Sequence, residues 1–204
     1  MDPASARPAA RAIGKERVRQ SILDAFIHLI VEGAADLSHD VIAERAGVGR
    51  RTVYRYYPDR NALLEGALLR VRELAGPKVT YPESAEDFLE TLEPIFTGFD
   101  SIAPIITMLR STPHGRQLRL AQNAKRISTY TKALAPEVKE LSQTDRKLAT
   151  AMLQMLHTTP WLEMRDHWGL TGREIARATN WAVRTLLNDL RKRGPLPLDE
   201  DVPS

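Results

Sequence analysis

The 204-residue sequence contains no cysteine, and only 6% of its residues are aromatic. Without cysteine the chain can form neither a disulfide framework nor a thiolate site. It also has no apolar run long enough to span a bilayer, and its first residues lack the apolar core of a secretory signal. We therefore expect a cytoplasmic protein that makes no membrane contact.

Signatures of catalysis are also missing. The five histidines are scattered along the chain, at His28, His39, His114, His157 and His167. Glu163 and His167 lie four residues apart, but two ligands do not make a metal site, and an exposed ion pair is the commoner reason for this spacing. Neither a phosphate-binding glycine loop nor a nucleophile elbow is present. We expect no catalytic residue, no metal and no cofactor, and hence no enzyme.

The net charge is only +3, so any strongly basic surface must be local. The first twenty residues carry an excess of positive charge, with Arg7, Arg11, Lys15, Arg17 and Arg19 against Asp2 and Glu16. Residues 1–14 are rich in alanine, proline and arginine, which predicts a disordered basic arm. Such an arm is either a solvated tail or a contact to DNA phosphate or the minor groove.

Residues 37–64 predict two short helices joined by a tight turn. Ser38 suits the N-cap of the first helix, whose narrow apolar face includes Ile42. Gly47 follows where that helix must stop, because glycine readily adopts the left-handed backbone of a tight turn. The second helix begins at Gly49 or Arg50, and its Val53 and Tyr57 lie four residues apart and can point inward.

The second helix has an unusual surface. It carries Arg50, Arg51 and Arg55 with no acidic residue before Asp59, and these arginines are interleaved with the hydroxyl-bearing residues Thr52, Tyr54 and Tyr56. Arginine binds guanine edges or phosphate through two parallel hydrogen bonds, and hydroxyl groups reach phosphate or base edges. A helix-turn-helix places such a helix in the major groove of DNA. The alternative is an ordinary basic helical hairpin.

The segment IAERAGVGRRTVYRYYPDRNALL, from Ile42 to Leu64, resembles the DNA-binding signature of TetR-family transcriptional regulators. With the preceding helix, the resemblance covers roughly a quarter of the chain. It implies an all-helical homodimer with an N-terminal DNA-binding domain and a larger domain for ligand binding and dimerisation. Three positions depart from the commonest pattern: Gly49 replaces a capping Ser or Thr, Arg60 a Lys, and Tyr57 a Phe, which adds a hydroxyl that needs a partner.

The resemblance places Tyr54 and Arg60 at positions that touch the DNA backbone. Ser38 lies at a helix N-terminus, which can also bind phosphate. The candidates for base contacts are Arg50, Arg51, Thr52 and Tyr56, with Asp40 as a weaker one because an acid can accept from cytosine N4. A dimer of this kind reads two half-sites, so we expect a near-palindromic operator in double-stranded DNA.

The rest of the sequence shows helical signals and no strand alternation, so the predicted fold class is all-α. We predict a helix-turn-helix DNA-binding domain at residues 15–62 and a helical effector-binding and dimerisation domain at residues 63–193. Residues 194–204 are predicted to be a disordered tail. Within the second domain we expect one long helix over residues 114–133, a boundary at Ala135 and Pro136, and a capping box from Thr171 to Glu174.

Large adaptable side chains in the second domain suggest a pocket for apolar compounds. The candidates are Phe88, Phe96, Met108, Tyr130, Met155 and Trp161, with Tyr130 and His157 able to orient a polar group of the ligand. Each of these taken singly is better explained as plain core, and only the whole set suggests a cavity.

The resemblance assigns dimerisation to residues 143–158 and 171–193. The second of these segments has a sustained apolar face, formed by Ile175, Ala178, Ala182, Leu186 and Leu190. This face either meets a second copy or packs within its own subunit.

The sequence therefore predicts a sequence-specific DNA-binding transcriptional regulator, a homodimeric repressor released by a small apolar effector. The alternative is a helical small-molecule-binding protein or enzyme with an incidental helical hairpin.

Overall fold

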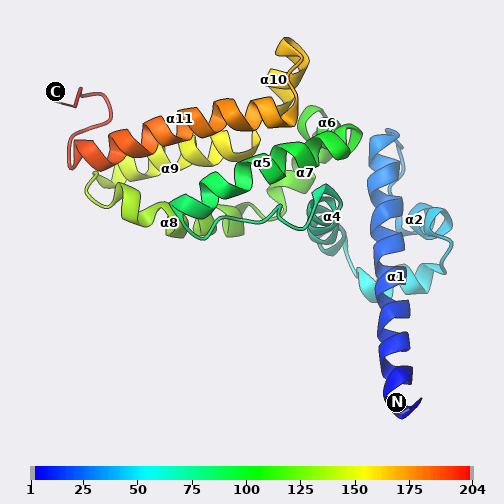
Figure 1. The fold of residues 1–204 in the computed structure, drawn as a ribbon. Coiled ribbons are helices and arrows are strands. Elements are labelled where there is room, and N and C mark those ends of the chain that lie inside the picture. The colour runs from blue at the N-terminus through cyan, green and yellow to red at the C-terminus, as the bar shows by residue number, and fades with distance from the viewer. Residues whose placement is uncertain (1–2, 203–204) are drawn as a thin grey trace. The chain divides into compact units, whose positions relative to one another are not determined.

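The computed structural model describes residues 3–202, with side chains from residue 12 onward. Regular structure in this part of the chain is entirely helical, which confirms the predicted all-α class (Figure 1). The helices are α1 (Pro3–Val31), α2 (His39–Ala46), α3 (Arg50–Tyr56), α4 (Arg60–Ala75), α5 (Ala85–Ser101), α6 (Ala103–Ser111), α7 (Pro113–Leu120), α8 (Asn123–Val138), α9 (Gln143–Thr158), α10 (Pro160–Trp168) and α11 (Gly172–Arg193).

The chain divides into two compact units. The first comprises Met1–Val71 and Thr107–Ala121, and the second comprises Arg72–Ile106 and Gln122–Ser204. The division falls inside α4, after Val71, whereas the sequence analysis placed it between residues 62 and 63. In addition, α7 groups with the N-terminal unit, although it was predicted to belong to the C-terminal domain.

In the first unit, one side of α1 forms the core with apolar residues of α2, α3 and α4. The fully buried side chains there are Ile22, Phe26, Ile42, Val53 and Leu63. Most of α4 belongs to this unit because the Arg70 guanidinium donates from Nε and Nη2 to the Asp24 carboxylate of α1, at 2.8 and 3.1 Å. This half-buried ion pair joins α4 to α1 within the first unit.

In the second unit, α11 packs along α5 and also meets α8, α9 and α10 (Figure 1). The side of α11 that enters the core carries Ile175, Thr179, Val183, Leu187 and Leu190. The predicted capping box is present: the Thr171 hydroxyl accepts from the Glu174 amide, and the Glu174 carboxylate accepts from the Thr171 amide at 2.8 Å. These hydrogen bonds hold the pKa of Glu174 below its usual value.

The helix predicted at residues 114–133 is instead two helices, α7 and α8, separated at Ala121 and Gln122. The Arg119 guanidinium of α7 donates to the Leu109 carbonyl of α6 at 2.8 Å, so tertiary contacts determine where α7 ends. The predicted boundary at Pro136 is absent, because α8 continues through this proline to Val138. Pro136 lies in the last turn, where the loss of one amide donor costs little.

Both chain ends differ from the predicted disorder. The backbone is helical from Pro3, in keeping with the high helix propensity of an alanine- and arginine-rich segment that begins with proline. At the other end, the nearly buried Arg193 guanidinium donates to Asp189 at 2.7 Å and to the carbonyls of Pro197 and Glu200. These bonds hold the tail in turns against α11. Residues 1–2 and 203–204, also predicted to be disordered, lie outside the described residues.

Candidate DNA interface

The turn between α2 and α3 has the predicted geometry. Ser38 caps α2, and its hydroxyl accepts from the Val41 amide at 3.5 Å. The backbone of Gly47 is left-handed, with φ 66° and ψ 33°, and the Val48 amide donates back to the Ala43 carbonyl at 3.0 Å. This arrangement ends α2 and turns the chain into α3 within a few residues.

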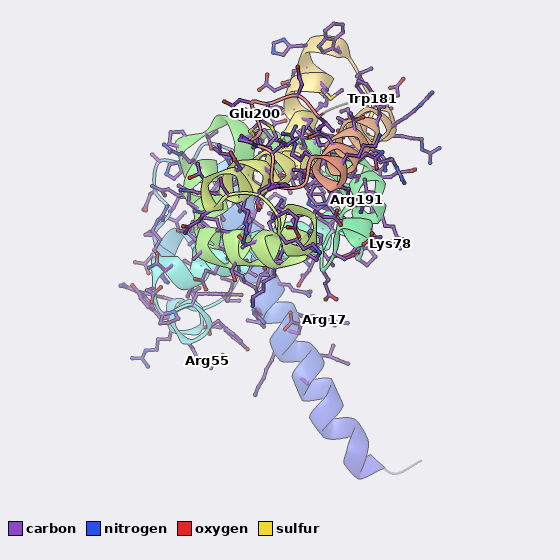
Figure 2. All side chains as sticks on the ribbon, turned by 90° about the vertical axis from the view of Figure 1, so that its left-hand side faces the viewer. Arg17, Arg55, Lys78, Trp181, Arg191 and Glu200 are labelled. Carbon is purple, nitrogen blue, oxygen red and sulfur yellow. The ribbon has the colours of Figure 1, made fainter. Side chains whose placement is uncertain are left out.

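Helix α3 has one buried side and one exposed side. Val53 and Tyr57 are buried, as predicted. Arg50, Arg51, Tyr54 and Arg55 are exposed, while Thr52 and Tyr56 are half-buried. Figure 2 shows Arg55 projecting outward from this helix. All of the candidate DNA-contacting side chains of α3 are therefore at least partly accessible.

A cluster of polar and aromatic side chains joins the start of α2 to α3. The Arg50 guanidinium lies 3.0 Å from the Asp40 carboxylate and 5.5 Å from the centre of the Tyr54 ring. Hydrogen bonding to Tyr54 and the charge of Asp40 raise the pKa of Arg50. Two candidate base-reading residues, Arg50 and Asp40, thus neutralise each other, and DNA must compete with this ion pair.

His39 was not among the predicted site residues, although it lies in this cluster. Its ring stacks on Tyr54, with the ring centres 4.2 Å apart and the planes within 8°. His39 Nε2 lies 2.9 Å from the Tyr57 carbonyl oxygen. Because a carbonyl can only accept, Nε2 carries the hydrogen. The stack joins residues fifteen positions apart, so no local pattern could have predicted it.

Two other arginines lie over aromatic rings. Arg60 begins α4, and its guanidinium lies 5.9 Å from the centre of the Phe26 ring. The Arg55 guanidinium lies 5.2 Å from the ring of Tyr56. Both side chains are exposed, so their charged groups are available to phosphate while the rings restrict their motion.

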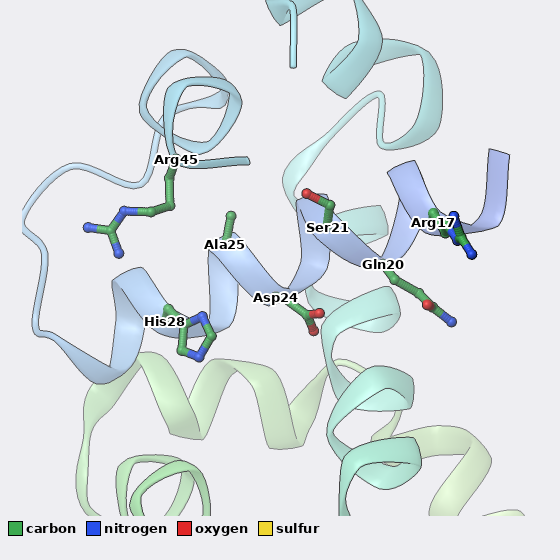
Figure 3. A pocket seen from close by; sticks show the side chains of 7 residues that line it. All are labelled: Arg17, Gln20, Ser21, Asp24, Ala25, His28 and Arg45. Atoms are coloured by element: carbon green, nitrogen blue, oxygen red, sulfur yellow. The ribbon is translucent and has the colours of Figure 1, made fainter. Parts of the chain in front are cut away.

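An open groove of about 380 Å³ lies along α1 in the same unit. Figure 3 shows the side chains that line it: Arg17, Gln20, Ser21, Asp24, Ala25, His28 and Arg45. Two of its charged groups have partners within the unit: Arg45 binds Glu32 through two hydrogen bonds of 2.8 Å, and Asp24 binds Arg70. These pairs join α2 to the residue that follows α1, and α4 to α1 itself.

Three of the predicted pocket residues meet in the second unit. Phe88, Tyr130 and His157 are buried together, with the Phe88 and His157 ring centres 4.1 Å apart. The Thr91 hydroxyl donates to the Asp87 carbonyl at 2.8 Å and accepts from His157 Nε2 at 2.9 Å. His157 Nδ1 then accepts from the Tyr130 hydroxyl. Burial lowers the pKa of His157 to about 3, so the ring is neutral.

The other predicted pocket residues lie elsewhere. Phe96 and Trp161 contact Phe99, and Trp161 Nε1 donates to the Asp100 carboxylate at 2.8 Å. Met155 is exposed, and Met108 belongs to the first unit. The predicted set is therefore not one constellation.

Searches for other kinds of site gave two results. Among the side chains that the structure describes, no three His, Cys, Asp or Glu residues are grouped so as to hold a metal. Between residues 3 and 202 no single helix is long and apolar enough to cross a bilayer. Together α5 and α6 meet the length and composition criteria, with a bend of 97° between them.

The fold and surface of residues 37–64 define a helix-turn-helix domain. Residues 22–67 match the family described as bacterial regulatory proteins, tetR family. Over 72 residues the chain is 38% identical to the HTH-type transcriptional repressor LfrR of Mycolicibacterium smegmatis, a match that covers 35% of this chain and 38% of the repressor. The N-terminal residues of the chain therefore match the tetR family model at the segment whose sequence resembles the family's DNA-binding signature.

The chain is also similar to a crystal structure described as that of a transcriptional regulator from Pseudomonas aeruginosa PAO1. The two are 20% identical with a TM-score of 0.49, over 88% of this chain and 93% of the other. This likeness is too weak to carry an argument.

Proposed function

We propose that the protein is a sequence-specific transcriptional regulator that binds double-stranded DNA through α3. The observation that carries this proposal is the exposed side of α3, which presents Arg50, Arg51 and Arg55 from a domain of the tetR family. Ser38, Tyr54 and Arg60 would bind the phosphate backbone around it, while Arg50, Arg51, Thr52 and Tyr56 would face the base edges. This role is that of a regulator in the cytoplasm rather than an enzyme.

The regulator would act as a homodimer. Three apolar side chains of α9, Leu148, Met152 and Met155, are about half exposed at helical spacing. On the neighbouring α11, Trp181 is 74% exposed and projects from the helix (Figure 2). Of the face predicted on α11, Ala178, Ala182 and Leu186 are half-buried, whereas Ile175 and Leu190 lie in the core. Four exposed apolar side chains on two adjacent helices support a surface that a second copy covers.

A small apolar effector would bind in the second unit and release the repressor from DNA. The part of the predicted pocket set that supports this is the buried group of Phe88, Tyr130 and His157. This group combines aromatic surface with two polar side chains, Tyr130 and His157, that hydrogen-bond to each other. Either side chain can bind a polar group of a ligand in place of the other. Because coupling is reciprocal, an effector that weakens DNA binding tenfold must itself bind the DNA complex tenfold more weakly.

The proposal is tested by gel retardation with random-sequence duplex over a range of salt. We expect retardation at low salt that weakens as salt rises. The logarithm of the binding constant should fall with the logarithm of the salt concentration, with a slope of roughly 0.9 for each phosphate contact. The control is a chain with Arg50, Arg51 and Arg55 changed to glutamine, which keeps helix propensity and removes the charge. If the wild-type chain gives no retardation at low salt, or the control binds equally well, the DNA-binding role is wrong.

A further inference from the structure

Tyr57 ends the recognition helix and connects it to the rest of its unit. It is the C-cap of α3, its amide donates to the Val53 carbonyl at 2.8 Å, and it is only 3% exposed. The buried hydroxyl of a tyrosine needs a hydrogen-bond partner, because an unpaired buried polar group destabilises the fold. The partners of this tyrosine come from helices on both sides of α3 in the sequence.

Three helices contact Tyr57. Arg19 of α1 donates from Nε to the Tyr57 hydroxyl at 3.1 Å. His39 of α2 donates to its carbonyl at 2.9 Å. On α4, Gly66 makes room for the ring, since a Cβ at that position would lie 2.8 Å from Tyr57 Cε1. The hydroxyl, the carbonyl and the ring are thus each held by a different helix.

The geometry points to Arg19 and Tyr57 as positioning residues that set how α3 is presented to DNA. This inference rests on the proposed DNA-binding function and adds a specificity determinant outside the base-contacting surface. The Arg19–Tyr57 hydrogen bond fixes the end of α3 against α1, so the exposed arginines of α3 keep one orientation. Base readout needs that orientation, because hydrogen bonds to base edges are directional. Nonspecific binding to phosphate is mainly electrostatic and tolerates a less well fixed helix.

The two contributions of Arg19, its charge and its donor, can be separated by substitution. Glutamine places its amide nitrogen the same number of bonds from the backbone as arginine Nε, so Arg19→Gln keeps the donor and loses the charge. Arg19→Met has similar length but loses both. Arg17, exposed on the same helix two residues earlier, provides matched controls in Arg17→Gln and Arg17→Met. Tyr57→Phe removes only the hydroxyl and keeps the packing of the ring.

The experiment measures affinity for two duplexes: one enriched from a random pool by the full wild-type chain, and a scrambled version of it. We compare the ratio of the affinity for the enriched duplex to the affinity for the scrambled duplex. Arg19→Met and Tyr57→Phe should each lower this ratio by about three- to tenfold, the range that one hydrogen bond is worth. Arg19→Gln should keep the ratio of the wild-type chain. The Arg17 variants should weaken both duplexes alike. Combining Arg19→Met with Tyr57→Phe should cost no more than either change alone, because both remove the same bond.

Two results would overturn the inference. One is that Arg19→Met lowers both affinities equally, as the Arg17 variants do. The other is that Arg19→Met and Tyr57→Phe act additively. Thermal unfolding of each variant shows whether it is folded. If the Arg19 variants do not fold, the affinity ratio of Tyr57→Phe, which keeps the buried ring, tests the inference alone. Failure of the wild-type chain to enrich any duplex contradicts the proposed function itself, which is a different result from an unchanged ratio.

Discussion

Arg50 and Asp40 carry opposite charges on the surface that we expect to meet DNA. Their side chains are 62% and 59% exposed, so the ion pair contributes little to stability. We propose a role in binding instead, in which the Asp40 carboxylate orients the Arg50 guanidinium and repels phosphate. This role does not require Asp40 to touch a base.

The substitution Asp40→Asn tests this role. Removing the carboxylate should strengthen binding to scrambled duplex by roughly two- to fivefold, the range of one exposed charge interaction. Binding to the enriched duplex should strengthen less, because Arg50 loses the partner that orients it. Fluorescence anisotropy with both duplexes measures the two affinities. Weaker binding to both duplexes would instead indicate that Asp40 itself contacts DNA.

Arg60 is expected to act through charge alone. Changing Arg60 to Ala should weaken binding to every duplex by the same factor and reduce the salt slope by roughly 0.9. The measurement is a series of binding titrations over salt concentration, with enriched and scrambled duplexes side by side. Loss of affinity for only one of the two would show that Arg60 reads sequence.

His157 makes stability depend on pH. Its pKa is lowered from 6.5 to about 3 by burial, so between these values the unfolded state binds the proton that the folded state excludes. The free energy of unfolding should then fall by about 1.4 kcal/mol for each unit of pH below about 6.5, and this contribution should be complete above it. Urea unfolding at several pH values measures this change in the free energy of unfolding per unit of pH. The change should be present in the wild-type chain and smaller in His157→Gln. The exposed His167→Gln is the control, and an equal slope in all three proteins would refute the assignment.

At the scale of the helices, local signals were predictable and tertiary ones were not. Gly47 and Thr171 mark helix ends through backbone and capping chemistry within a few residues, and the structure has both. The end of α7 depends instead on Arg119 reaching the Leu109 carbonyl, which no pattern within residues 114–133 reveals.

In the candidate site, too, local features were predictable from the sequence and tertiary contacts were not. The accessible side of α3 follows from helical spacing around Val53 and Tyr57. The sequence also showed that the Tyr57 hydroxyl would need a partner, but not that Arg19, 38 residues away, supplies it. The predicted pocket residues differ in burial, because composition cannot tell an exposed Met155 from a buried Trp161.

At the scale of the whole molecule, the two proposed roles lie in different units. The candidate DNA-contacting residues, from Ser38 to Arg60, all belong to the first unit, and the exposed apolar face of α9 and α11 belongs to the second. Helix α4 contains residues of both. In the proposed homodimer, the second unit would set the spacing of the two copies of α3.

Dimerisation is tested by placing charge on the exposed face. Met152→Glu and Trp181→Glu should each weaken self-association by at least roughly 30-fold, the ~2 kcal/mol lost at an interface hot spot. Trp168→Glu is the matched control, because Trp168 is 78% exposed but lies on α10. Sedimentation velocity over a range of concentrations gives the association constants. A monomeric wild-type chain, or equal effects of the two tryptophan substitutions, would contradict the proposed interface.

Whether α3 reads base sequence can be measured from the base preferences of the wild-type chain and of Arg51→Ala in a random duplex pool. We expect a near-palindromic preference for the wild-type chain. In Arg51→Ala, preference should be lost at one base position in each half-site, at a cost of roughly 1–3 kcal/mol for the preferred base there. An unchanged set of preferences in Arg51→Ala, or no preference in the wild-type chain, would contradict base readout by α3.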